Sequence, residues 1–530
     1  MTTDTVAIIN QPGAITSMQI ELPYQADTLA LYQRLCQHHA HNLLLDSAEI
    51  QSRQHLKSLL MVDAALQLRC NDQQVIITAL TSNGAQVLPW LAEQLNSSAV
   101  QLELSKDQLH CHFSAIDDRL DEDSRLRQSS NCEPLRILQQ RLQQTQPHPL
   151  GIFLGGIFAY DYVASFESLP AVPTGANSCP DYVFYLAETL LVIDHQQRST
   201  TLLANLLSGP QSADYYPQIA DKVGAIAAQC QLPRKLAQAP RCSQSAKPLS
   251  VTAEPDAERF AQMVEQLQQH ILAGDIFQVV PSRRFTLPCN DALAAYAKLK
   301  AANPSPYMFF LRSDDFEVFG ASPESALKYT ASSNQVELYP IAGTRPRGKN
   351  ADGSINHDLD SRLELELRLD QKELAEHMML VDLARNDLAR IAKPGSRYVA
   401  NLLQVDRYSH VMHLVSRVVA QLADDLDALS AYRACMNMGT LVGAPKVRAA
   451  ELIRQFEQQR RGSYGGAVGY LSGNGDMDTC IVIRSAFVKG GQAIVQAGAG
   501  VVFDSVAAAE VAETEGKARA VIQAIQEAAL

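Results

Sequence analysis

The stretch that decides the fold class is GAVGYLS (466–472), followed by CIVIRSAFV (480–488) and AIVQAGAGVVF (493–503). Three runs rich in apolar and β-branched residues come one after another, and only short polar segments separate them. Strands that follow each other this closely pair antiparallel through short turns, because a parallel sheet needs a longer crossover between strands. Further strand candidates are YMFFLR (307–312) and VELYPIAGT (336–344), and helical patterns are predicted at 360–392, 426–438, 445–458 and 505–528. The sequence therefore predicts an α+β (mixed α/β) fold in which large, mostly antiparallel β-sheets are sandwiched with outer helices.

Chain length and one change in composition set the expected domain division. With 530 residues, 46% of them hydrophobic, the chain can bury a large core. Length alone suggests roughly three domains of about 150 residues. Residues 232–256, LPRKLAQAPRCSQSAKPLSVTAEPD, are rich in Pro, Ser, Ala and Gln, which is typical of a linker. We therefore predict an N-terminal region at 1–231 and a C-terminal catalytic region at 257–530.

Charge and cysteine usage exclude several classes of function. The net charge of −12 and the pI of about 5.6 argue against nucleic acid as a main partner. The ten cysteines include no C-x-x-C pair, which favours reduced thiols over a disulfide framework or a zinc site. The HCH run at 110–112 is a weak metal candidate, because alternation along a strand turns its middle residue away from the other two. The start of the chain lacks a basic segment, and no apolar run reaches the ~18 residues of a membrane span. We expect a cytoplasmic protein without membrane contact.

Two predicted helices each place acidic side chains on one face. The first, QKELAEHMMLVDLARND (371–387), carries Glu373, Glu376 and His377 at i, i+3 and i+4. Its expected apolar stripe consists of Leu374, Met378, Val381 and Leu388. The second, AAAEVAETEGKARA (507–520), carries Glu510, Glu513 and Lys517 on one face. Like charges on one face are unfavourable unless a cation neutralises them, so we expect the two faces to share one site.

Four converging carboxylates favour a hard divalent cation such as Mg²⁺, held by one or two of them and completed by another oxygen-rich ligand. The remaining carboxylates could then transfer protons. The competing interpretation is that both faces are simply solvated, which is the usual state of a single Glu-x-x-Glu face. A di-iron centre would need Glu-x-x-His on two helices, but position 374 is Leu and the second helix has no His.

Three further features suggest anion binding. AGAGVV (497–502) leads from a strand toward the second acidic helix, and its glycines would let backbone N–H groups approach an anion. GTRPRG (343–348) is a basic loop that could hold a carboxylate or be solvated. Arg484 is expected inside a β-branched strand, where an arginine is rarely buried unless it is paired. The residues alone therefore indicate a metal-dependent enzyme that acts on a small, polycarboxylated substrate.

Several motifs, in order, resemble those of the chorismate-utilising enzymes. They are PIAGTRPRG (340–348), KELAEHMMLVDLARND (372–387), RYSHVMHLVSRV (407–418), YGGAVGY (464–470), IVIRSA (481–486), AGAGVVFDS (497–505) and EVAETEGKARA (510–520). The resemblance covers about 260–525 and implies that family's mixed α/β sandwich. Within the family, the chain resembles the large, aminating subunits (component I) of anthranilate synthases.

The resemblance implies roles for individual residues. Glu376 and Glu513 would be Mg²⁺ ligands, Glu373 the general acid that protonates the departing C4 hydroxyl, and Glu510 a further acidic group near the metal. His413 matches the family's active-site histidine, whereas His377 and His410 match supporting or structural positions. The residues implied to bind chorismate are Gly343, Thr344, Tyr464, Arg484, Gly498, Ala499, Gly500 and Lys517.

Two positions decide which reaction the resemblance implies. Family members that use water carry Lys where this chain has Gln278, and a glutamine cannot act as the base that activates water. Aminodeoxychorismate synthases carry a lysine nucleophile where this chain has Ala342. The expected reaction is therefore Mg²⁺-dependent amination of chorismate at C2 by ammonia with loss of pyruvate. The product would be anthranilate, in the first committed step of tryptophan biosynthesis. Alternatives are an aminodeoxychorismate, isochorismate or salicylate synthase and, in another class, a non-catalytic tryptophan-sensing protein.

Regulation and a partner are also implied. LLLDSAEI (43–50), LKSLL (56–60) and NPSPYMFF (303–310) resemble a tryptophan regulatory pocket, in which Asp46 replaces the commoner Glu. Its predicted lining is Ser47, Lys57, Pro306, Tyr307 and Met308. No cysteine lies in the G-x-C-x-G turn that a glutaminase nucleophile favours. We therefore expect a separate glutamine amidotransferase subunit (component II), in a heterotetramer, to supply the ammonia.

Overall fold

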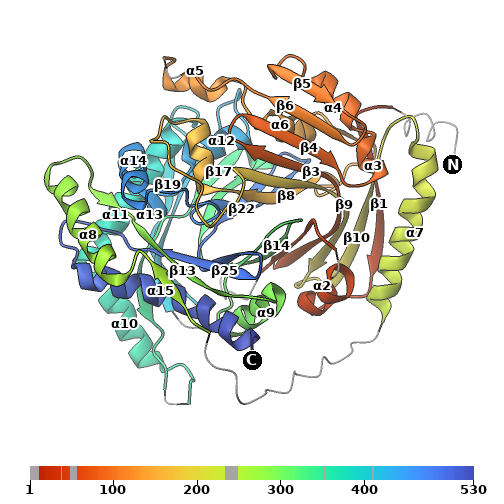
Figure 1. Cartoon of the computed structure of the whole chain (residues 1–530). Helices are drawn as coiled ribbons and strands as arrows, with labels where there is room; N and C mark the ends of the chain where they lie inside the picture. Colours follow the sequence, from red (N-terminus) through yellow and green to blue (C-terminus); the bar gives the residue numbers. More distant parts are fainter. Residues whose placement is uncertain are drawn as a thin grey trace.

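A large, mostly antiparallel sheet organises the chain. The computed structural model describes residues 11–37, 39–47, 56–117, 119–232, 249–350, 352–408 and 411–530. Within these ranges 23 strands join through hydrogen-bonded ladders, and β12 and β21 form a separate two-stranded pair. Among the described strand pairs only β1 and β7 run parallel. The predicted fold class is confirmed, and helices lie outside the strands (Figure 1).

The strands have the following bounds: β1 (Ala14–Leu22), β2 (Asn42–Asp46), β3 (Lys57–Asn71), β4 (Gln74–Ala79), β5 (Gln101–Leu104), β6 (Gln108–His112), β7 (Gln143–Gln144), β8 (Phe153–Phe158), β9 (Tyr182–Asp194), β10 (Ser199–Leu207), β11 (Thr252–Glu254), β12 (Gln278–Val279), β13 (Ser282–Pro288), β14 (Tyr307–Arg312), β15 (Glu317–Ser322), β16 (Ser325–Thr330), β17 (Gln335–Leu338), β18 (Ile341–Pro346), β19 (Tyr398–Arg407), β20 (Val411–Gln421), β21 (Gly443–Ala444), β22 (Ala467–Ser472), β23 (Met477–Ile481), β24 (Ser485–Lys489) and β25 (Gln492–Gly498).

The helices are α2 (Thr28–Cys36), α3 (Ser82–Ala85), α4 (Leu88–Leu95), α5 (Glu122–Arg127), α6 (Glu133–Gln140), η1 (Tyr160–Ser165), α7 (Ser212–Gln231), α8 (Ala257–Leu272), α9 (Ala292–Ala302), η2 (Ala331–Ser333), α10 (His357–Leu369), α11 (Gln371–Ala389), α12 (Ala428–Cys435), α13 (Gly439–Val442), α14 (Lys446–Glu457) and α15 (Ala507–Ala528). The predicted helix at 360–392 is two helices, because the Asp370 side chain accepts hydrogen bonds from the amides of Lys372 and Glu373 and so begins α11 anew. In the described part of the chain no helix is long and apolar enough to span a membrane.

The N-terminal and C-terminal parts of the chain share ladders. β2 pairs with β14, where Asp46 lies opposite Met308, and β8 pairs with β22, where Gly155 lies opposite Tyr470. Figure 1 shows β8 and β22, which lie far apart in the sequence, side by side. The proposed linker at 232–256 falls largely on residues 233–248, which lie outside the described residues. The domain division therefore stays a prediction.

The predicted strand 480–488 is interrupted at Arg484. β23 ends at Ile481 and pairs with β16 and β22, whereas β24 begins at Ser485 and pairs with β15 and β25. Between them Arg484 has a left-handed backbone with φ of +49°, which a side-chain-bearing residue rarely adopts. The chain thus changes sheet partners at this residue, and Arg484 lies in the break rather than inside a strand.

Candidate active site

Helix α11 buries a face that only partly matches the predicted stripe. Met378 is 44% exposed, so the predicted stripe is wrong at this position, whereas the half-buried Leu374 packs against the small core cluster of Leu367, Met412 and Leu414. The buried face consists of His377, Leu380, Val381, Ala384, Asp387 and Leu388. His377 fits there because its Nε2 lies 2.6 Å from the hydroxyl of Ser416, and because burial lowers its pKa to about 4, which keeps the ring uncharged. This environment supports the structural role predicted for His377, whereas His410 lies outside the described residues.

The acidic faces of α11 and α15 act on each other. Burial raises the pKa of Glu376 to about 7, and the charges of Glu373, Glu513 and Glu510 add to this effect against the opposing charge of Lys372. Burial also raises the pKa of Glu510, whose Oε2 has no hydrogen-bond partner among the described residues. The two helices therefore bring these four carboxyl groups into one electrostatic environment.

Lys517 ties this cluster to the loop after β25. Burial acts to raise the pKa of Glu513, but Lys517, whose Nζ lies 2.6 Å from its Oε1, outweighs burial and holds that pKa below its usual value. The same ammonium donates to the carbonyl of Gly498 at 2.9 Å. Glu513 is therefore an ionised carboxylate beside the predicted chorismate-binding glycines.

The donor set suits a hard divalent cation. Among the described residues no three Asp, Glu, His or Cys side chains already stand close enough to hold a metal ion. Mg²⁺, however, needs only one or two protein carboxylates and takes its other oxygens from substrate and water. The buried Oε2 of Glu510 without a donor and the mutual repulsion at Glu376 are what a cation would relieve. The carboxylates of α11 and α15 therefore fit Mg²⁺.

His413 on β20 lies against the bulge of β18. Its Nδ1 lies 3.2 Å from the carbonyl oxygen of Gly343 and 3.0 Å from the hydroxyl of Thr344. Burial lowers the pKa of His413 to about 4, so the ring is neutral at pH 7. Nδ1–H donates to the Gly343 carbonyl, which leaves Nε2 as a hydrogen-bond acceptor.

Gly343 brings β18 against Glu373. The strand register shifts at this position and φ is +77°, a conformation that favours glycine. A Cβ atom added at Gly343 would lie only 3.2 Å from Oε2 of Glu373. Glu373 itself forms an ion pair with Arg345, with Nη1 3.1 Å from Oε1. The basic loop GTRPRG is thus partly engaged by α11 rather than free to hold a ligand.

Arg484 supplies an unpaired cation. Burial lowers the pKa of its guanidinium, against the opposing effects of Tyr464, Glu513 and Glu324. Among the described residues its guanidinium has no hydrogen-bond or ion-pair partner, unlike the arginines of the basic loop. The guanidinium is only partly exposed and has no protein partner among the described residues, so this position suits a carboxylate ligand.

The glycine loop after β25 closes against Gln278 and Tyr464. A Cβ at Gly498 would lie 2.9 Å from the Tyr464 hydroxyl, and a Cβ at Gly500 would lie 2.8 Å from Nε2 of Gln278. The amide of Ala499 donates to the carbonyl of Pro281 at 3.1 Å, so this predicted backbone donor is already used. Gln278 is buried, and its Oε1 has no hydrogen-bond partner among the described residues. That orphaned oxygen can accept a hydrogen bond from a small donor.

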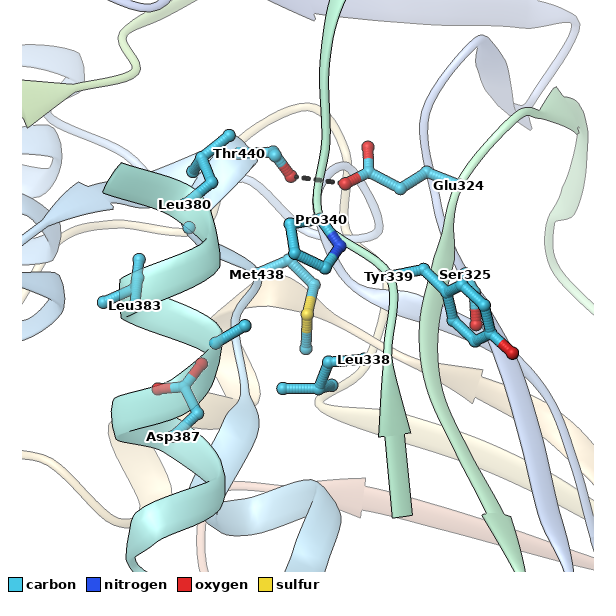
Figure 2. Close-up of a pocket in the computed structure, with 12 residues that line it drawn as sticks. Glu324, Ser325, Leu338, Tyr339, Pro340, Leu380, Leu383, Asp387, Met438 and Thr440 are labelled. Atoms are coloured by element: carbon cyan, nitrogen blue, oxygen red, sulfur yellow. Dashed lines mark hydrogen bonds between the residues drawn. The ribbon is translucent and has the colours of Figure 1, made fainter. Parts of the chain in front are cut away.

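Sequence reasoning missed Glu324, in the turn between β15 and β16. This residue is buried, and burial raises the pKa of its carboxyl to about 8, although Thr440, Arg484 and Lys517 act in the opposite direction. Figure 2 shows Glu324 at one end of a small pocket, with Pro340, Leu380 and Met438 along it. The available signal was a single charged residue within the otherwise uncharged FGASPESAL (319–327). At pH 7 most of this carboxyl is protonated, so it can donate a proton.

The predicted regulatory residues lie around the start of β14. The hydroxyl of Ser47 donates a hydrogen bond to the carbonyl oxygen of Pro306 at 3.3 Å. Strand β2, which ends just before Ser47, pairs with β3, which begins at Lys57. The Nζ atom of Lys57 lies 3.7 Å from Oδ2 of Asp194. Asp46 is buried and accepts hydrogen bonds from Thr28, Ser58 and Lys300. The structure thus brings the segments around Ser47 and Pro306–Met308 together.

Comparison with known proteins assigns the family. A family model described as "chorismate binding enzyme" matches residues 93–523. The chain belongs to this family. The motif resemblance is confirmed. The family model begins its match at residue 93, whereas the motifs suggested a resemblance over 260–525 only.

Relatives of this chorismate-binding enzyme match this chain over nearly their whole length. Anthranilate synthase component 1 from Vibrio cholerae is 56% identical over 517 residues, which cover 98% of this chain and 97% of that protein. The protein of the same name from Escherichia coli is 53% identical over 523 residues, covering 97% and 98%.

Solved structures give the same fold. The crystal structure of anthranilate synthase component I from Streptococcus pneumoniae is 28% identical with a TM-score of 0.66, covering 90% of this chain and 95% of that one. The menaquinone-specific isochorismate synthase from Escherichia coli is 18% identical with a TM-score of 0.63, covering 99% and 98%. The latter likeness shows the fold alone.

Proposed function

We propose that this chain catalyses the Mg²⁺-dependent amination of chorismate at C2 by ammonia with loss of pyruvate, which gives anthranilate, the first committed step of tryptophan biosynthesis. The observation that carries the proposal is Gln278, a buried amide with an orphaned Oε1 beside the glycine loop. An amide accepts a hydrogen bond from ammonia but is not a base that would activate water. The names of relatives that are more than 50% identical support the same reaction.

The substrate would be held through its two carboxylates. Arg484 offers an unpaired guanidinium, and Gly498 and Gly500 offer close backbone approach beside Tyr464. Lys517 fixes this loop through the Gly498 carbonyl. Thr344 lies beside His413, whose neutral ring presents Nε2 as an acceptor.

Glu376 and Glu513 would hold Mg²⁺, with Glu510 as a nearby carboxyl group. When bound, the ion supplies positive charge that neutralises a substrate carboxylate and stabilises negative charge developing in the reaction. The role of this chain's carboxylates is to place that charge between α11 and α15.

Proton delivery to the leaving C4 oxygen has two candidate donors. Glu373 is ion-paired with Arg345, whose Nη1 lies 3.1 Å from Oε1 of the carboxylate. Glu324 is buried, has a pKa raised to about 8 and lies near Arg484. We assign proton donation to Glu324. The role of Glu373 would be to position Arg345 and the bulge at Gly343.

The bond changes balance without an oxidant or reductant. A C2–N bond forms as ammonia attacks, the C4–O bond breaks and the hydroxyl leaves as water with the proton from Glu324. The nitrogen then gives up the extra proton of the attacking ammonia, which replaces the one taken from Glu324. Loss of the C2 proton and cleavage of the C3–O bond leave the aromatic amine, and the departing enolpyruvate takes up one proton at its methylene carbon to become pyruvate. The nucleophile must be un-ionised ammonia, because an ammonium ion has no lone pair.

Ammonia would come from a glutamine amidotransferase partner (component II). The nine cysteines in the described part of the chain are all buried and form no disulfide there, and burial raises the pKa of thiols such as Cys70 and Cys435. Raised pKa and burial are the opposite of what a nucleophilic thiolate needs. Feedback by tryptophan would act through Ser47, Lys57 and Pro306–Met308.

Product analysis tests this function. The purified chain is incubated with chorismate, Mg²⁺ and an ammonium salt, and the products are separated by chromatography. We expect anthranilate and pyruvate in equal amounts. Aminodeoxychorismate, isochorismate or salicylate as the main product, or no turnover, would overturn the proposal.

A further inference from the structure

A fully buried ion pair contacts several segments of the candidate active site. Glu457 is the last residue of α14 and Arg461 follows it by four residues, and both side chains are only 1% exposed. Nε of Arg461 donates to Oε2 of Glu457 at 3.0 Å, and Nη2 donates to Oε1 at 2.6 Å, which makes the pair bidentate. Because desolvation offsets much of the attraction within a buried pair, stability alone explains its presence poorly.

Two further hydrogen bonds of Arg461 join separate segments of the chain. Nη1 donates to the carbonyl oxygen of Leu441 at 2.8 Å, and Nη2 donates to the carbonyl oxygen of Val280 at 2.6 Å. Val280 directly follows β12, and Leu441 lies in α13, two residues before β21. The two strands pair with each other, with Gln278 opposite Ala444. The donors of a guanidinium have a fixed planar geometry, so Arg461 sets the separation of these two segments.

Each of the two segments carries one end of the proposed chemistry. Gln278, the proposed acceptor for ammonia, precedes the first bonded carbonyl by two residues. Thr440 directly precedes the second, and its hydroxyl donates to the carboxyl of Glu324, the proposed proton donor, at 3.0 Å. The distance between the nucleophile end and the leaving-group end of the site therefore depends on where the guanidinium holds the two carbonyls.

The guanidinium of Arg461 also lies against Tyr464. Its Cζ atom is 5.6 Å from the centroid of the Tyr464 ring and 4.7 Å from that of Tyr160, which is within the range of a cation–π interaction. The Tyr464 hydroxyl lies beside Gly498, where an added Cβ would be only 2.9 Å away. The glycine loop is thus a third part of the site that packs on a side chain contacting Arg461.

Glu457 fixes the guanidinium to the sheet. Its Oε1 accepts hydrogen bonds from the backbone N–H of Ser282 at 2.9 Å and from the Ser282 hydroxyl at 2.7 Å, at the start of β13. The Ser282 hydroxyl in turn accepts a hydrogen bond from the side-chain amide of Gln496 on β25 at 2.8 Å. The carboxylate is therefore held by two neighbouring strands, and it holds Arg461 in one orientation.

We propose that Arg461, held by Glu457, is a positioning residue that sets the distance between Gln278 and Glu324. This inference rests on the proposed function, which assigns ammonia to Gln278 and the leaving-group proton to Glu324. Arg461 acts through the two carbonyls and has no direct part in the bond changes. A lysine at this position would keep the charge, but a single ammonium lacks the rigid fork that bonds both carbonyls and the carboxylate at once.

The test separates a displaced site from a loss of folded protein. Arg461→Lys keeps the charge, and the double variant Arg461→Met/Glu457→Leu removes the pair without leaving a buried unpaired charge. Arg433→Lys is the matched control, because Arg433 on α12 is also buried and also donates to main-chain carbonyls, those of Leu126 and Gln128. The kcat and the KM for ammonium are measured at constant pH with saturating chorismate and Mg²⁺.

Both Arg461 variants should raise the KM for ammonium at least tenfold and lower kcat at least tenfold, because the nucleophile and the proton donor are no longer aligned. A smaller amount of folded enzyme would lower only the apparent kcat, so the KM is the deciding quantity. Arg433→Lys should keep the KM for ammonium within twofold of that of the parent chain.

A KM for ammonium within twofold of the parent value in both Arg461 variants would overturn the positioning role. An equal rise in Arg433→Lys would overturn it as well, because the effect would then follow from losing any buried arginine. Failure of the parent chain to make anthranilate from ammonium would instead overturn the proposed function, so the two failures are distinguishable.

Discussion

The hydroxyl of Thr440 donates a hydrogen bond to the carboxyl of Glu324 at 3.0 Å, across the end of the cavity drawn in Figure 2. Thr440 belongs to the short helix α13, and Glu324 belongs to the turn between β15 and β16. This bond fixes a buried carboxyl whose other electrostatic neighbours include Arg484 and Lys517. The group that we propose as proton donor is thus held beside the cation that we assign to the substrate.

Replacement of Glu324 tests its assignment as the proton donor. Glu324→Gln keeps the shape of the side chain but cannot donate a carboxylic proton, so kcat should fall by about 10²–10⁴. The KM for chorismate should change little. Steady-state kinetics with saturating ammonium measure both, and Glu373→Gln is the comparison. A larger loss in kcat for Glu373→Gln than for Glu324→Gln would return the role to Glu373.

The pH profile should carry the titration of Glu324. Burial raises its pKa to about 8, so the protonated form is present below pH 8 and is lost as the pH rises through that value. Un-ionised ammonia increases over the same range, so the rate must be divided by its concentration. The corrected rate should fall above about pH 8, and a corrected rate that stays flat to pH 10 would contradict the assignment.

Arg484 should control chorismate binding. Loss of a charge-assisted hydrogen bond of ~1.5–3 kcal/mol predicts that Arg484→Gln raises the KM for chorismate by about 10- to 100-fold. Arg484→Lys keeps the charge but not the forked geometry. Its KM for chorismate should therefore lie between those of the parent chain and of Arg484→Gln. Arg362→Gln, on an exposed face of α10, is the control. An unaltered KM in Arg484→Gln would remove this residue from the site.

Metal dependence tests the pairing of α11 with α15. Glu376→Gln and Glu513→Gln should each raise the Mg²⁺ concentration needed for half-maximal activity by at least tenfold, because each would remove one carboxylate ligand. Direct titration with Mg²⁺ by calorimetry gives a readout apart from turnover. Glu366→Gln, on exposed α10, is the matched control. Full activity of the parent chain in excess EDTA would contradict the metal assignment.

Tryptophan should inhibit through the segments joined by the Ser47–Pro306 hydrogen bond. Ser47→Phe would fill the space beside Pro306 and should raise the inhibitory concentration at least tenfold, with kcat unaltered. Linkage also requires that chorismate and tryptophan weaken each other's binding by the same factor. Ser333→Phe, in the exposed turn η2, is the control. Equal inhibition of Ser47→Phe and the parent chain would place the regulatory pocket elsewhere.

Sequence patterns predicted the features that depend on local spacing. Adjacent apolar runs predicted the antiparallel pairs β22–β23 and β24–β25, and Glu-x-x-Glu spacing predicted the acidic faces of α11 and α15. Spacing could not fix which face of α11 is buried, because His377 is polar yet fits the core by bonding to Ser416 on a distant strand. It also could not reveal Glu324, whose role depends on Thr440 and Arg484, residues brought near it only by folding.

The measurement that tests the central claim most directly follows the nitrogen atom. The purified chain is supplied with chorismate, Mg²⁺ and ¹⁵N-ammonium in the absence of any other protein, and the aromatic product is analysed by mass spectrometry. The account predicts anthranilate one mass unit heavier than the unlabelled compound, with one pyruvate released per molecule. A product without the label, or a hydroxylated product carrying solvent oxygen, would contradict it.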